Sequence, residues 1–184
     1  VCSSDLVLLI RNDDEAKAAS NARYTALWTS VFVLIVSVAI WIMFDPSTAE
    51  FQFVEQKAWI PSYGIQYYLG IDGISLFLII LAAFLTPVCI LCSWEAIQKR
   101  VKEYMVAFLV MESLMIGVFS SLDFVLFYLF FEAMLIPMFL IIGVWGGPRR
   151  IYAAFKFFLY TLVGSVLLLV ALLVMYFEAG TTSI

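Results

Sequence analysis

The sequence predicts an all-α protein, a polytopic bundle of transmembrane helices, from three observations. The chain has 184 residues, of which 65% are hydrophobic and only 13% are charged. Soluble domains are closer to half apolar, so one globular core could not bury this much apolar surface. Several apolar runs reach about 20 residues, the length that a helix needs to cross a lipid core of about 30 Å. Basic residues gather between alternate runs, as expected for a chain that threads a membrane repeatedly.

Five spans are predicted, over residues 24–44, 73–94, 104–122, 124–147 and 151–177. Lipid offers no water to backbone groups, so spanning segments must be helices or strands of a closed barrel. These runs are too long and too evenly apolar for barrel strands, in which polar and apolar residues alternate. The short apolar stretch near residues 6–10 is expected to be the stump of an earlier span.

The first six residues, VCSSDL, invite a different interpretation. The nucleotides GTGTGCTCTTCCGATCT encode them, and that string resembles a sequencing-library adapter. We therefore expect residues 1–6, Cys2 included, to be an assembly artefact joined to a truncated gene. The transmembrane fragment is then residues 7–184.

The basic residues predict the orientation. Only Lys57 lies at one end of the predicted bundle, and the other nine lie at the opposite end: Arg11, Lys17, Arg23, Lys99, Arg100, Lys102, Arg149, Arg150 and Lys156. By the positive-inside rule, the basic end faces the cytoplasm or the mitochondrial matrix. Residues 45–70 then form an external loop, whose aromatic residues we interpret as an interfacial belt, with ligand binding as the alternative.

Two glutamates, Glu112 and Glu132, lie within predicted spans, where an acid costs at least about 2.5 kcal/mol. Each is about 10 residues from the polar turn at residues 120–123. At 1.5 Å per residue, both are roughly 15 Å from the turn, near the midplane of the membrane. The two carboxyls are therefore expected at one depth on neighbouring antiparallel helices.

A buried carboxyl can take up and release a proton, as a proton relay requires. The alternative is a protonated glutamate that makes a structural hydrogen bond between helices. Pro137 bears on Glu132, because a proline leaves the carbonyl of Ala133 without its helical donor, one residue from the acid. The alternative is an ordinary proline of a membrane helix, which is common.

Several other polar residues lie in or beside the spans. Lys156 is about five residues into the last span, where it could either extend to the headgroups or join the relay. On the same helix, Tyr160, Thr161 and Ser165 could line a hydrated path, or could equally pack between helices. We expect Asp72 and Asp123 to cap helix N-termini.

The sequence does not indicate a redox, metal, nucleotide or nucleic-acid site. Cys89 and Cys92 form a CxxC pattern, but without a second such motif we expect two buried, inert thiols. The chain has no histidine, and neither a glycine-rich phosphate loop nor a metal-ligand cluster is evident. Its basic residues are too few to suggest nucleic-acid binding.

Four segments of the chain carry recognisable motifs. The most specific is FYLFFEAMLIPMFLIIGVWGG at 127–147, and the others are LGIDGISLFLIILAAFLTPVCIL at 69–91, MESLMIGVFSSLD at 111–123 and AAFKFFLYTLVGS at 153–165. The first resembles the fifth helix of a known family, the antiporter-like M subunits of respiratory complex I, whose mitochondrial counterpart is subunit 4 of NADH:ubiquinone oxidoreductase. The others resemble its third, fourth and sixth helices. The resemblance covers roughly residues 7–178.

This resemblance implies fourteen transmembrane helices in the whole protein, with two inverted five-helix repeats. It makes Glu132 the key glutamate of helix five, Glu112 an acid of helix four, and Lys156 a lysine of helix six found in bacterial members. In the family, the helix-five glutamate pairs with a lysine on a broken seventh helix, and this chain ends before that helix.

The resemblance also implies a function. The complete protein would be a proton-translocating subunit that lacks a redox centre, while NAD, FMN, iron–sulfur clusters and quinone belong to other subunits. Its partners would be the other membrane subunits and the lipid bilayer, without nucleic acid. We expect a bacterial plasma (inner) membrane, with the mitochondrial inner membrane as the alternative. The competing interpretations are a subunit of a multi-subunit cation/proton antiporter and a structural membrane subunit with vestigial acids.

Overall fold

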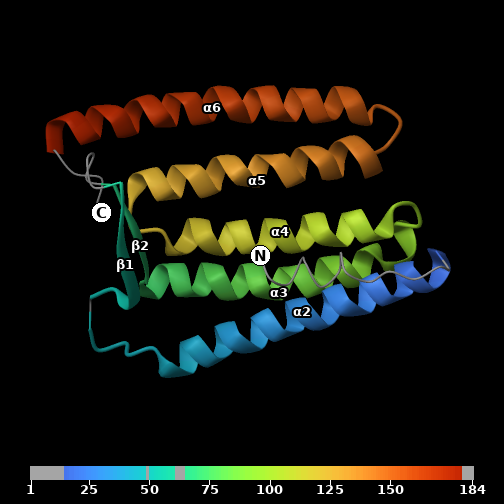
Figure 1. Cartoon of the computed structure of the whole chain (residues 1–184), viewed down its shortest axis with the longest axis horizontal. Helices are drawn as coiled ribbons and strands as arrows, with labels where there is room; N and C mark the ends of the chain where they lie inside the picture. Colours follow the sequence, from blue (N-terminus) through green and yellow to red (C-terminus); the bar gives the residue numbers. More distant parts are fainter. Residues whose placement is uncertain (1–14, 49, 61–64, 180–184) are drawn as a thin grey trace.

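The computed structural model describes residues 15–48, 50–60 and 65–179, which form five long helices and one β-hairpin (Figure 1). In chain order the elements are α2 (Glu15–Met43), β1 (Gln52–Ile60), β2 (Ile65–Ile71), α3 (Gly73–Ala96), α4 (Val101–Ser120), α5 (Phe124–Trp145) and α6 (Arg150–Ala179).

Each of the five helices is long and apolar enough to cross a membrane. The predicted fold class, an all-α polytopic bundle, is therefore confirmed. The first helix begins at Glu15 rather than at residue 24, because the helix continues through a polar segment that precedes the apolar run. Two predictions, the artefact at residues 1–6 and the stump near residues 6–10, lie outside the described residues.

The helices lie side by side and alternate in direction (Figure 1). Helices α2, α3 and α4 contact one another, α5 packs on α4, and α6 packs on α5. A cluster of buried residues holds the three-helix group together: Ala22, Ala26, Ile90, Val101, Tyr104, Met105 and Leu109. Among the described elements, α6 therefore packs chiefly on α5 and forms one edge of the bundle.

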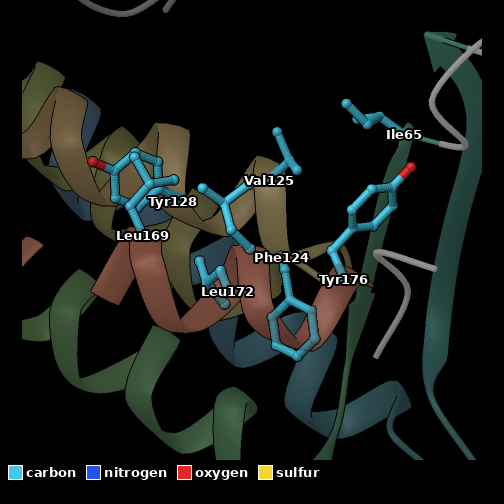
Figure 2. A pocket seen from close by; sticks show the side chains of 8 residues that line it. Ile65, Phe124, Val125, Tyr128, Leu169, Leu172 and Tyr176 are labelled. Atoms are coloured by element: carbon cyan, nitrogen blue, oxygen red, sulfur yellow. The ribbon is translucent and has the colours of Figure 1, made fainter. Parts of the chain in front are cut away.

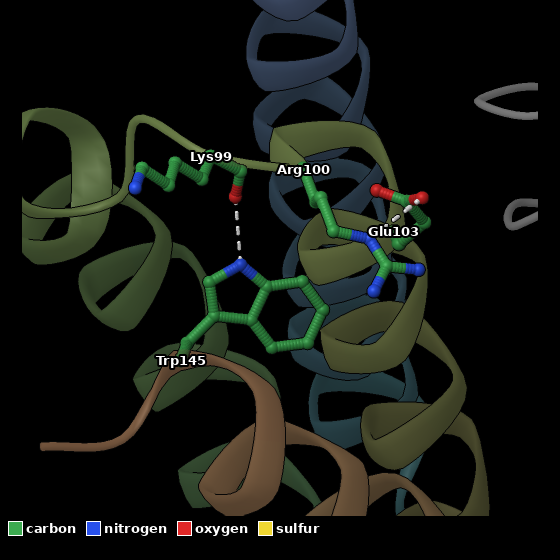
Figure 3. Close-up of polar contacts among 4 residues, drawn as sticks. All are labelled: Lys99, Arg100, Glu103 and Trp145. Atoms are coloured by element: carbon green, nitrogen blue, oxygen red, sulfur yellow. Dashed lines mark hydrogen bonds and ion pairs between the residues drawn. The ribbon is translucent and has the colours of Figure 1, made fainter. Parts of the chain in front are cut away.

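The loop between α3 and α4 lies at the end of the bundle that carries most of the lysine and arginine residues, which we call the basic end. Neighbouring helices hold this loop from two sides. Arg23 of α2 donates to the carbonyl of Ile97 at 2.7 Å. Trp145 of α5 donates from Nε1 to the carbonyl of Lys99 at 2.8 Å (Figure 3). Arg100, in the left-handed region at φ 52°, pairs with Glu103 at 3.2 Å.

The opposite end, which we call the hairpin end, carries the antiparallel strands β1 and β2. The sequence predicts only an external loop at residues 45–70, and the structure instead has this hairpin. Strand β2 rests on the turn between α4 and α5, where Leu122 donates its N–H to the carbonyl of Tyr68 at 2.9 Å. Gly70 allows this close approach, since a Cβ at that position would lie 2.5 Å from Leu122 Cδ1.

Both predicted helix caps are confirmed. The Asp72 side chain accepts from the backbone N–H of Ser75 at 2.7 Å, and the Ser75 hydroxyl accepts from the N–H of Asp72, which completes a capping box for α3. The Asp123 side chain accepts from the N–H groups of Val125 and Leu126 at the start of α5. Hydrogen bonds from Ser75, chiefly its side chain, lower the pKa of Asp72.

Large apolar side chains cover much of the outer surface of the bundle, as a lipid environment permits. Cys89 and Cys92 are free thiols and are exposed on this surface. The prediction that they are buried was therefore wrong for the described structure. An apolar run predicts burial only where water surrounds the protein, whereas lipid accepts the same side chains on the outside.

Candidate functional site

The two glutamates lie at matching levels of α4 and α5. Glu112 is eight residues before the end of α4, and Glu132 is eight residues after the start of α5. At 1.5 Å per residue, each is about 12 Å along its helix from the connecting turn. This agrees with the depth that the sequence predicts, near the middle of the bundle.

Glu112 points into the group formed by α2, α3 and α4. Its side chain is only 3% exposed, and it follows Met105 and Leu109 along one buried face of α4. The Thr86 hydroxyl of α3 is close enough to interact with its carboxyl. No donor in the described part of the chain reaches Glu112 Oε1, so one oxygen of a buried acid is left without a hydrogen bond.

Glu132 has a different environment. It is half-buried, and Tyr128, one turn earlier on α5, donates its hydroxyl to Glu132 Oε1 at 2.8 Å. The Ser165 hydroxyl of α6 lies close enough to interact with that same tyrosine hydroxyl. Ser165 is itself 2% exposed, whereas Tyr128 and Glu132 are half-buried, so these polar groups are only partly covered.

The two acids point to opposite sides of the α4–α5 pair. Phe130 packs on Gly117 of α4, where a Cβ would lie 2.9 Å from the phenylalanine ring. Residues two apart on a helix point about 200° apart, so Glu132 faces away from α4. The acids thus share a level without facing each other, and each has its own polar neighbour: Thr86 on α3 for Glu112, and Tyr128 on α5 for Glu132.

A proline lies close to each acid. Helix α5 continues through Pro137, which leaves the carbonyl of Ala133 without its usual helical donor. Helix α3 continues through Pro87, which directly follows Thr86. Both acids therefore lie beside helix segments where the regular backbone hydrogen bonding is interrupted.

Lys156 is not brought to either glutamate within the described structure. Ala154 is 1% exposed and packs against α5 at Gly143, so Lys156, two residues later, points away from α5. Its ammonium group lies 5.9 Å from the centre of the Tyr152 ring, within cation–π range. Tyr160 shares this outer face of α6 and is 83% exposed.

Of the polar residues predicted for α6, only some face α5. Ser165 is buried against it, whereas Tyr160 lies on the outer face. Thr161 is half-buried and donates to the carbonyl of Phe157 within its own helix at 2.8 Å. These side chains therefore do not line a single path.

An apolar pocket of about 200 Å³ lies between α5 and α6 on the hairpin side of Glu132 (Figure 2). Its lining comprises Ile65, Phe124, Val125, Tyr128, Leu169, Leu172, Leu173 and Tyr176. Ile65 and Tyr176 lie toward the hairpin end in Figure 2. Tyr128 is the lining residue that donates to Glu132, one helical turn further along α5. The ring of Tyr128 thus contacts the pocket while its hydroxyl contacts the acid.

Two residues of this site, Tyr128 and Thr86, were not predicted from the sequence. Tyr128 could have been found, since a residue four positions before an acid on a helix shares its face. Thr86 carries no such signal, because its proximity to Glu112 depends on how α3 packs against α4. Among the described residues, no group of three His, Cys, Asp or Glu side chains is arranged to hold a metal ion.

Two family models match the chain. Residues 19–122 match the model described as NADH-ubiquinone oxidoreductase chain 4, amino terminus. Residues 121–184 match the transmembrane model of NADH:quinone oxidoreductase and Mrp antiporter proteins. The boundary between the two matches falls at the turn between α4 and α5, and therefore between the two glutamates.

Named relatives agree with these matches. The chain is 59% identical to NADH-quinone oxidoreductase subunit M of Rhodobacter capsulatus over 167 residues, which cover 91% of this chain and 32% of that protein. It is 54% identical to NADH-ubiquinone oxidoreductase chain 4 of Arabidopsis thaliana, over 88% of this chain and 33% of that protein. The chain thus spans about a third of the length of the curated relatives that it matches.

Solved structures share the fold. Respiratory complex I from Thermus thermophilus contains a chain that superposes with a TM-score of 0.79 and 25% identity, over 99% of this chain and 36% of that one. The Mrp complex from Dietzia also gives a TM-score of 0.79, over 99% of this chain and 19% of that one, but at 20% identity it shows the fold alone. Since the chain 4 model covers more than half of the sequence, this protein belongs to the NADH-ubiquinone oxidoreductase chain 4 family, together with the bacterial M subunits.

Proposed function

We propose that the complete protein is a proton-translocating membrane subunit of NADH:quinone oxidoreductase, respiratory complex I. It couples NADH oxidation and quinone reduction, which occur in other subunits, to proton pumping across the membrane. The observation that carries this proposal is Glu132, an acid in the middle of a membrane-spanning helix that is hydrogen-bonded by Tyr128. The proposal is also supported by the 59% identity of this chain to a bacterial subunit M.

In this proposal the three predicted residues hold and move protons at different places. Glu132 is the central proton carrier, beside the interrupted backbone at Pro137. Glu112 is a second carrier on α4, with one carboxyl oxygen able to accept a further hydrogen bond. Lys156, on the outer face of α6, points toward whatever packs on that face in the complete protein, so its relay role depends on residues beyond this chain.

The chain would carry no redox centre of its own. NAD, FMN, iron–sulfur clusters and quinone would belong to other subunits of the complex, and this chain would supply membrane-embedded proton sites. Its partners would be other membrane subunits and lipid, in a bacterial plasma membrane. The mitochondrial inner membrane is the alternative, since plant chain 4 is nearly as similar as bacterial subunit M.

A segment exchange tests this function. Residues 19–179 would replace the matching segment of subunit M in Rhodobacter capsulatus, and inverted membrane vesicles would be supplied with NADH. We expect an assembled complex that generates a proton gradient at more than about half of the native rate. An assembled chimera that oxidises NADH without forming a gradient would contradict the proposal.

The same experiment addresses the antiporter alternative. The likeness to the Mrp complex extends to the fold but stops at 20% identity, far below the identity to subunit M. An antiporter subunit would restore sodium-dependent proton exchange, without support from NADH, in a strain that lacks only the matching subunit of its antiporter. We expect no such exchange from the complete protein.

A further inference from the structure

The hydroxyl of Tyr128 contacts the central acid of α5. It donates to Glu132 Oε1 at 2.8 Å from one helical turn away. The Ser165 hydroxyl of α6 is near enough to influence the same tyrosine hydroxyl, without a hydrogen bond between the two in the structure. One hydroxyl therefore contacts the central acid and lies near a hydroxyl of the neighbouring helix.

The hydrogen-bonding capacity of these groups allows two arrangements. A hydroxyl has one hydrogen to donate and two lone pairs that accept. Ser165 gives its single hydrogen to the carbonyl of Leu162 at 2.9 Å, which leaves its oxygen able to accept. The hydrogen of Tyr128 can therefore point either to Glu132, as in the structure, or to Ser165.

We propose that Tyr128 is a positioning residue for Glu132, which satisfies its carboxyl in both protonation states by reversing one hydrogen bond. Toward the carboxylate, Tyr128 donates. Toward the protonated acid, Tyr128 accepts from the carboxyl O–H and turns its own hydrogen to Ser165. Only hydrogen bonds change in this reversal, so Tyr128 neither gains nor loses a proton. This inference rests on the proposed function of Glu132 as a proton carrier.

The surroundings explain why a single hydroxyl matters here. The Tyr128 ring lines the apolar pocket between α5 and α6, whose other walls are mainly aliphatic and aromatic (Figure 2). Phe130 occupies the side of α5 that faces α4. Among the described hydrogen bonds, the one from Tyr128 is the only one that a side chain donates to Glu132.

The test replaces Tyr128 with phenylalanine in the complete subunit, within the assembled complex. The substitution keeps the ring that lines the pocket and removes only the hydroxyl. The control is Tyr24→Phe, since Tyr24 lies on α2, is 54% exposed and contacts Trp94 through its ring. Two quantities are measured: NADH-driven proton uptake by inverted vesicles, and the infrared carbonyl band of protonated Glu132, identified by its loss in Glu132→Gln.

We expect Tyr128→Phe to lower the proton-uptake rate about tenfold, which is the rate change that corresponds to the loss of one hydrogen bond to a charged group. We also expect the Glu132 carbonyl band to move to higher frequency, since the acid loses its acceptor. Ser165→Ala should move the band in the same direction by less and lower uptake about threefold. Tyr24→Phe should change neither quantity.

Two outcomes overturn the inference. One is an unchanged band or unchanged uptake in Tyr128→Phe while Glu132→Gln abolishes uptake, and the other is an equal effect in Tyr24→Phe. Failure of the underlying function looks different, because Glu132→Gln would then take up protons at the native rate in an assembled complex.

Discussion

At the scale of single residues, Glu112 is the most unusual group in the described structure. It is 3% exposed, and its Oε1 has no hydrogen-bond donor among the described residues. A buried acceptor left unsatisfied costs about 1–3 kcal/mol. Under the proposed function, a task of Glu112 in proton movement accounts for this cost, since the acid would not contribute to stability.

A substitution separates these two roles. The methionine of Glu112→Met has a volume similar to that of glutamate and lacks the unsatisfied oxygen. We therefore expect the midpoint of thermal unfolding of the purified complete subunit to stay the same or rise. Leu109→Ala, on the same buried face, should instead lower the midpoint, because a cavity there costs about 2–5 kcal/mol. Tryptophan fluorescence during heating measures both. A clear fall for Glu112→Met would show that the acid makes a structural hydrogen bond.

The level of each acid could be predicted from the sequence, but the side to which it points could not. Counting residues from the polar turn gives the distance of Glu112 and Glu132 along their helices. The rotation of a helix about its axis follows from a polar and an apolar face, and these helices are apolar nearly all round. The contact of Phe130 with Gly117, which directs Glu132 away from α4, depends on packing alone.

At the scale of elements, the caps were predictable and the hairpin was not. An acid directly before an apolar run is a local signal for an N-terminus, and both Asp72 and Asp123 fulfil it. Strand β1, QFVEQKAWI, does not alternate apolar and polar residues, which is the pattern that predicts a strand, and most of it is exposed. The pairing of β1 with β2, and the hydrogen bond from Leu122 to β2, could not be predicted from the sequence.

The Asp72 cap should make the start of α3 sensitive to pH. Hydrogen bonds from Ser75 lower the pKa of Asp72 below its usual value of 3.8, so its contribution is complete above that value and disappears as the pH falls through the lowered one. Asp72→Ala should cost about 1 kcal/mol at neutral pH, seen as faster hydrogen exchange in the first turn of α3. Asp72→Asn, which keeps an acceptor, should lose the pH dependence. Equal exchange in all three proteins at neutral pH would contradict the assignment.

The contact between α4 and α5 should tolerate no side chain at Gly117. A Cβ there would lie 2.9 Å from the Phe130 ring, so Gly117→Val should destabilise the complete subunit by about 1–3 kcal/mol. Gly73→Ala is the control, because nothing lies within 4 Å of its added Cβ. Thermal unfolding compares the two variants, and equal midpoints would show that α5 does not pack as described.

At the scale of the whole molecule, the basic end and the hairpin end lie at opposite ends of the bundle, as the positive-inside rule requires. Lys57 lies in the hairpin, whereas Lys99 lies in the loop that Trp145 holds at the basic end (Figure 3). In a protein without native cysteines, Lys57→Cys should react with a membrane-impermeant maleimide in intact cells. Lys99→Cys should react only in inverted vesicles. The reverse labelling pattern would show that the protein has the opposite orientation in the membrane.

In the proposed function Glu132 carries protons in the complete protein, and replacing this acid tests that role. Glu132→Gln and Glu103→Gln would be compared in assembled complex, as NADH-driven proton uptake by inverted vesicles. Glu103 is a suitable control because it is an exposed acid at the basic end, paired with Arg100. We predict at least a tenfold loss of uptake, about 1.4 kcal/mol, for Glu132→Gln and less than about a twofold change for Glu103→Gln. Native uptake by assembled Glu132→Gln complex would contradict the claim and would make the acid structural.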